Sequence, residues 1–159
     1  MASQLEAILD RVHAVNVEIK TVYVGFDLHP SRYYPRSKEI GSLPLITPVM
    51  MGATLNNETY GSNELTITWT IENILFVDNF FAGSGNSDVQ DNAEKCIDHI
   101  IDAYWQRPRL ELEASGAFDC IMGDARLTRV SGLEVDVNTN LAVVRFTHLI
   151  ESTDDFERL

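Results

Sequence analysis

Four side chains belong to the types that bind zinc, although their spacing is unlike that of structural zinc sites. They are Cys96, His99, Cys120 and His148. Cys96 and His99 are three residues apart in a helical pattern, so both could point the same way. The other two stand alone, without a C-x-x-C or H-x-x-x-H pair. We therefore expect no metal site and two buried, reduced cysteines.

Acidic side chains also occur in pairs on one predicted helix, a pattern that can hold a divalent cation. The pairs are Asp88 with Asp91 and Asp98 with Asp102. Because acids outnumber bases by 24 to 12, such pairs arise by chance, and a solvated helix face is the simpler interpretation. The glycine-rich residues 83–85 lack the Gly-Lys-Ser/Thr of a phosphate loop. We expect no enzyme, no catalytic residue and no cofactor, with a metal-assisted hydrolase as the residual alternative.

Aromatic and arginine side chains gather in two segments whose composition predicts exposed loops. Residues 27–42 hold two prolines, and residues 79–86 form a glycine-rich link. The candidate interface residues in these loops are Arg32, Tyr33, Tyr34, Arg36, Phe80 and Phe81. Tyrosine and arginine dominate the energetics of protein interfaces, so we predict that these residues contact a partner. The alternative is that each loop folds back and packs its aromatic rings on the core.

The chain before the first loop predicts a helix followed by a strand. Ser3 and Glu6 form a capping box, and apolar residues then recur every three or four positions. The helix is expected to end near Asn16. The β-branched run at residues 17–24 predicts a strand, so Ile19 fits either element.

The strands in the middle of the chain are expected at residues 43–49 and 64–77, separated by a turn-like segment at 52–63. Pro44 and Pro48 place the first of these strands at a sheet edge or break it, because proline cannot donate to a ladder. The second strand alternates apolar and polar residues until the pattern slips at residues 73–74. A bulge or burial of both faces would explain this slip.

The second half of the chain predicts a helix and two closing strands. The helix begins at Ser87 and stops before Pro108, and the strands are expected at residues 120–131 and 141–152. Its expected buried residues are Val89, Ala93, Cys96, Ile97, Ile100, Ile101 and Tyr104. The element order α-β-β-β-α-β-β predicts an α+β fold, a mainly antiparallel mixed sheet with two principal helices on one face.

The composition indicates one acidic globular domain. The 159 residues carry a formal net charge of −12, and 45% of them are hydrophobic. We expect a single domain at residues 1–152 and a polar tail at residues 153–159. An acidic surface repels phosphate, so nucleic-acid binding and adhesion to anionic membranes are disfavoured. We read no signal peptide or membrane span in the pattern and expect the chain to be made and kept in a cytoplasm.

The order of these features is similar to that of one known family. The matching features are the helix at residues 3–16, the Leu43-Pro44 strand entry, the alternating strand 64–77, the helix residues Ile97, Ile100, Ala103 and Tyr104 leading into Arg107-Pro108-Arg109-Leu110, and the closing run 144–151. Over residues 3–152 the chain resembles the tail terminator proteins of long-tailed bacteriophages, which are minor tail proteins that cap the tail tube. The resemblance is one of element order and pattern.

This resemblance implies a virion structural protein that forms a homo-oligomeric ring, a hexamer, on the last ring of the tail tube protein. Such a ring ends tube polymerisation and presents a surface to the head–tail connector protein. It implies assembly in the host cytoplasm and no cofactor. DNA would pass through the lumen without specific binding, because carboxylates repel its phosphates. Two alternatives remain: another head–tail connector or tail tube-like protein, or a cytoplasmic acidic adaptor or small-molecule-binding α+β domain.

Overall fold

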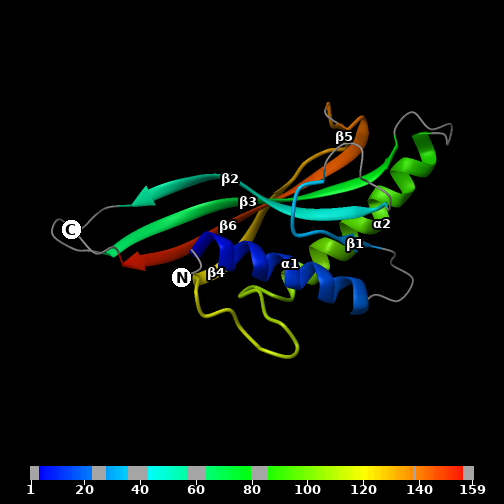
Figure 1. The fold of residues 1–159 in the computed structure, drawn as a ribbon. Helices are drawn as coiled ribbons and strands as arrows, with labels where there is room; N and C mark the ends of the chain where they lie inside the picture. The colour runs from blue at the N-terminus through cyan, green and yellow to red at the C-terminus, as the bar shows by residue number, and fades with distance from the viewer. Residues whose placement is uncertain are drawn as a thin grey trace.

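The expected α+β class is confirmed by a computed structural model, which describes residues 4–22, 28–35, 43–56, 64–79, 86–137 and 139–155. Two helices pack against a mixed sheet of six strands (Figure 1). In chain order the elements are α1 (Gln4–Val22), β1 (His29–Pro30), β2 (Leu45–Asn56), β3 (Glu64–Asn79), α2 (Asn86–Trp105), β4 (Met122–Val130), β5 (Glu134–Val135) and β6 (Leu141–Asp155).

The sheet is built around β3 and β6, which pair antiparallel along almost their whole length. The strand order is β1-β2-β3-β6-β4, and β5 adds a short pairing to one end of β6. Every pairing is antiparallel except the short one between β1 and β2. Since β1 reaches only as far as Ile46, the outer edge of β2 from Thr47 to Asn56 meets no strand in the described ranges.

The main core lies between the two helices and one face of the sheet. Its fully buried members from α1 recur every three or four residues: Ile8, Val12, Val15 and Ile19. They meet residues of α2, β3 and β6, among them Ala93, Cys96, Ile100, Ile71, Leu75, Val144 and Phe146. Both helices therefore cover the same face, which we call the helix-facing side.

The prediction of a strand at residues 17–24 is wrong for residues 17–22, because α1 continues to Val22. Ile19 lies on the buried stripe of the helix, and packing against the sheet outweighs the weak strand preference of the β-branched run. The rest of this segment, residues 23–24, lies outside the described residues.

The alternation of apolar and polar residues breaks at residues 73–74, but β3 keeps the same side toward the helices there. Asn73 keeps to the helix-facing side, where it is a buried polar residue among apolar ones. Ile74 and Phe76 form a second buried cluster with Leu141 and Val143. Both faces of β3 are therefore covered here, so burial of both faces explains the slip in the pattern. The register shift lies further along the strand, between Phe76 and Asp78.

Strands β2 and β6 are both longer than expected. Residues 52–56 were predicted as a turn, yet they pair with residues 66–70 of β3. The expected edge position holds only in part: Leu45 and Ile46 pair with β1 on the outer side, whereas Pro48 meets no strand there in the described ranges. At the other end of the chain, β6 continues to Asp155, so the first three residues of the expected tail belong to the sheet.

The expectation of two buried cysteines is half right. Cys96 is 4% exposed, and this burial raises the pKa of its thiol to about 11, so it stays protonated near neutral pH. Cys120 is exposed, because it precedes β4 in a turn that the core does not cover.

Candidate assembly surfaces

The first of the predicted loops crosses the edge of the sheet beside β1. The Ser31 amide donates to the Ile46 carbonyl oxygen, which holds the loop to β2. Arg32 then turns toward α1, where its Nε lies 2.6 Å from Asp10 Oδ1. The same guanidinium lies 5.0 Å from the centre of the Tyr33 ring, and Tyr33 is 73% exposed. Arg32 therefore anchors the loop, while Tyr33 presents its ring to solvent.

Tyr34 faces the other side of the sheet and packs partly on the core. Its ring meets Phe76 edge-on at 5.7 Å, and its hydroxyl donates to Asp136 Oδ2 at 3.4 Å. Burial and the nearby Asp136 carboxylate raise the pKa of Tyr34, so the phenol stays neutral. The loop thus divides its two tyrosines: Tyr34 folds back on the core, and Tyr33 does not. The other candidates, Arg36, Phe80 and Phe81, lie outside the described residues.

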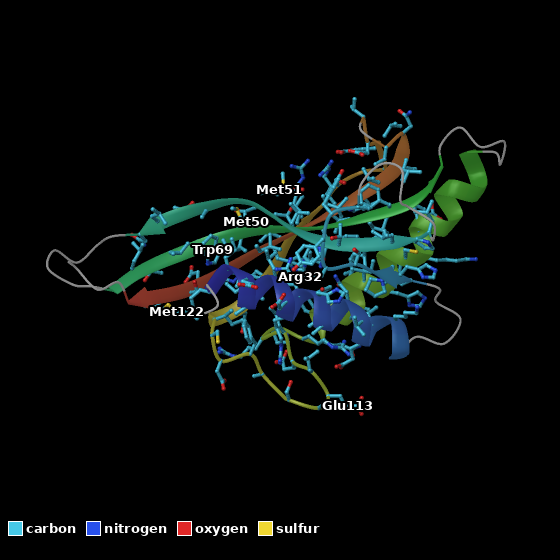
Figure 2. All side chains as sticks on the ribbon, viewed as in Figure 1. Arg32, Met50, Met51, Trp69, Glu113 and Met122 are labelled. Carbon is cyan, nitrogen blue, oxygen red and sulfur yellow. The ribbon has the colours of Figure 1, made fainter. Side chains whose placement is uncertain are left out.

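The sheet also forms an arm that projects past the N-terminal end of α1 (Figure 1). We define the arm as residues 52–56 of β2, 64–70 of β3 and 149–155 of β6, which are joined by the strand register. Apolar side chains are exposed on it and at its base: Leu55 is 63% exposed, Met51 53% and Met50 39%. Figure 2 shows both methionines on β2, with Trp69 on the neighbouring strand. These residues were not predicted from the sequence, where their signal is a strand without any charged side chain.

A groove of about 810 Å³ lies between the end of α2 and the edge strand β4. Its apolar lining includes Ile101, Trp105, Leu127 and Val130. Trp105 is 84% exposed and Ile101 37%, so Ile101 is not the buried residue that the helical pattern predicted. Ile101 lies at the border of the helix stripe, where no strand beyond β4 covers it in the described part of the chain.

A ring of polar side chains is buried in the core and joins both helices to β3 and β6. Tyr104 Oη donates to Asn16 Oδ1 at 2.5 Å and accepts from Asn73 Nδ2 at 2.9 Å. Asn16 Nδ2 donates to Asn73 Oδ1 at 2.9 Å, and His148 Nε2 lies 3.2 Å from Asn73 Nδ2. These residues are at most 4% exposed, which leaves a substrate no access. We interpret this network as structural, because it fixes how the four elements meet.

His148 is neutral in this network. Burial lowers its pKa to about 4. Since Asn73 Nδ2 is a donor, His148 Nε2 accepts and the ring proton lies on Nδ1. Nδ1 has no hydrogen-bond partner among the described residues. No group of three or more His, Cys, Asp or Glu side chains in the described ranges is arranged to hold a metal ion, and the zinc set of the sequence analysis does not assemble.

Comparisons with known proteins assign no family to this chain. No model of a known protein family matches it, and no curated protein matches it. Among the described helices, none has the length and apolar character needed to span a membrane. A functional assignment therefore depends on the surfaces described above.

Proposed function

We propose that this protein is a phage tail terminator, a virion structural protein that forms a ring on the end of the tail tube. In this role it stops tube growth and offers a surface to the head–tail connector protein. The α+β architecture is the one that the resemblance to this family implies. The proposal is one of assembly and not of catalysis, and its strongest support comes from the edge of strand β2.

From Val49 to Asn56 the outer edge of β2 is uncharged and meets no strand in the described ranges, whereas Thr47 and Pro48 before it are buried. None of the 12 residues of β2 carries a charge, whereas the other edge strand, β4, carries Asp124, Arg126 and Arg129. Proteins that remain alone protect such edges with charges, because open backbone groups pair with other chains. Among the described residues, this edge has only Pro48 and the register shift between Met50 and Gly52 as protection. This unprotected edge, with apolar side chains exposed beside it, is what a partner protein would cover.

The charge of −12 supports the same role. A ring around the DNA path must let the duplex slide, and a surface that holds phosphate would retard it. We propose that carboxylates face the lumen and that DNA passes without specific binding. The neighbouring role of a tube-like protein predicts a different location, along the tube wall instead of at its end.

Gold labelling in the electron microscope tests the proposal. Labelled protein is mixed with preformed tubes of the tube protein encoded in the same genome. A terminator decorates one end of each tube, whereas label along the wall indicates a tube-like protein and absence of label contradicts both roles. Met51→Glu is expected to abolish end binding, since it charges the open β2 edge. The control, Val137→Glu, likewise replaces an apolar side chain by glutamate, at a 90% exposed position outside β2, and is expected to bind.

A further inference from the structure

The α2–β4 groove carries an unbalanced positive charge. Arg126 and Arg129 line it and are exposed, and neither forms an ion pair with a residue in the described ranges. Asp124 is the one acidic residue that lines the same groove. Arg126 and Arg129 thus line the same groove as exposed Trp105 and Ile101, in a chain whose net charge is −12. Such a surface suits an acidic segment that also carries an apolar side chain.

The arm has the complementary composition. Its three strand segments contain no lysine or arginine. By register, Glu64 pairs with Asp155, and Asp154 pairs with Leu65, so acidic residues are concentrated at its far end. Leu55, which is 63% exposed, lies on the adjoining strand and supplies the apolar side chain. The arm is thus opposite in charge to the groove, and both expose apolar side chains.

The base of the arm adjoins the groove of the same chain, because Leu149 pairs with Arg126, but the acidic far end of the arm does not reach it. Arg129 pairs with Thr147 on β6, and Asp155 is eight residues further along that strand. At about 3.3 Å per residue, the end of the arm lies roughly 26 Å beyond this position along the sheet. An arm end that occupies the groove must therefore come from another molecule.

We propose that the arm of one copy docks in the α2–β4 groove of a second copy. The acidic end of the arm faces Arg126 and Arg129, and Leu55 packs on Trp105. This contact joins two different surfaces, so each copy offers one arm and one groove. Repetition of such a head-to-tail contact closes a ring when the rotation permits. The inference rests on the proposed function, because it names the contact between neighbouring subunits of the ring.

Charge-swapped variants test this contact by sedimentation velocity across the micromolar range. The groove variant is Arg126→Glu with Arg129→Glu, and the arm variant is Asp154→Arg with Asp155→Arg. Each is expected to weaken self-association about tenfold or more, because attraction becomes repulsion at the docked surfaces. An equimolar mixture is expected to restore association, since each altered arm then meets an altered groove of opposite charge. The control for the groove variant, Lys20→Glu with Lys95→Glu, changes the net charge by the same amount and sign on exposed helix positions and is expected to associate as the wild type does.

Three results would overturn the proposal: a wild type that stays monomeric throughout, variants that associate as strongly as wild type, or a mixture that fails to restore association. Circular dichroism checks that each variant folds. Should the groove pair unfold, Trp105→Gln takes its place, because that side chain contributes little to the core. A protein that caps tubes but stays monomeric at all concentrations contradicts the arm contact and leaves the proposed function standing. A protein that forms arm-dependent rings but does not bind tubes supports the arm contact and contradicts the proposed function.

Discussion

The buried imidazole of His148 makes a quantitative prediction about acid stability. The unfolded chain binds a proton at this residue below about pH 6.5, the ordinary histidine pKa. The folded chain does not bind it until about pH 4, because burial lowers the pKa. Between these values protons favour the unfolded state, so stability is full above pH 6.5 and is lost as the pH falls toward 4.

The magnitude follows from the difference in pKa. pH 5 is about 1.5 pH units below the unfolded pKa, and each unit corresponds to about 1.36 kcal/mol. Burial of neutral His148 therefore lowers the free energy of unfolding by about 2 kcal/mol at pH 5. His148→Gln keeps an acceptor for Asn73 Nδ2 but removes the titrating group. The variant is therefore expected to lose about 2 kcal/mol less than the wild type between pH 7 and pH 5. Other titrating groups, His13 included, cancel in this difference.

Urea unfolding at both pH values, followed by far-ultraviolet circular dichroism, measures this difference. Tyr104→Phe is the matched control, since it alters the same network without removing a group that titrates in this range. Its stability is expected to stay parallel to that of the wild type as the pH falls. If wild type and His148→Gln lose the same free energy between pH 7 and pH 5, His148 titrates normally in the folded protein and the reasoning fails.

Three further outcomes follow from the described contacts. Tyr104→Phe leaves Asn16 and Asn73 short of one partner each and is expected to cost about 1–3 kcal/mol at neutral pH, measured by urea unfolding. Tyr33→Ala is expected to change stability by less than about 0.5 kcal/mol. Tyr34→Ala loses the contact with Phe76 and should cost clearly more than Tyr33→Ala in the same assay; equal effects would place both rings in the same environment. A maleimide is expected to label Cys120 in the native protein and Cys96 only after unfolding, which mass spectrometry of the labelled peptides can check.

The sequence predicted those elements whose pattern is local. Strand β3 alternates over most of its length, and α2 begins close to its capping residue and ends before Pro108, so both were located within one or two residues. The end of α1 was misplaced, because a short β-branched run suits a strand or a helix and tertiary packing decides between them.

The surfaces were harder to predict because they depend on residues that are distant in the chain. Asn73 interrupts an apolar pattern for a reason visible only when Tyr104, Asn16 and His148 surround it. The α2–β4 groove likewise requires the sheet order, since β4 pairs with β6 and leaves Ile101 uncovered. Composition did predict Tyr33 as an exposed aromatic residue, but it could not distinguish this residue from Tyr34.

The central claim is that this protein ends tube growth, and the length of tubes assembled in its presence tests it most directly. Tube protein is polymerised with increasing amounts of the chain, and lengths are measured by negative-stain electron microscopy. A terminator is expected to shorten the tubes as its molar ratio rises, and Met51→Glu is expected to lose this effect while Val137→Glu keeps it. Tubes that grow to the same lengths at every ratio would contradict the account.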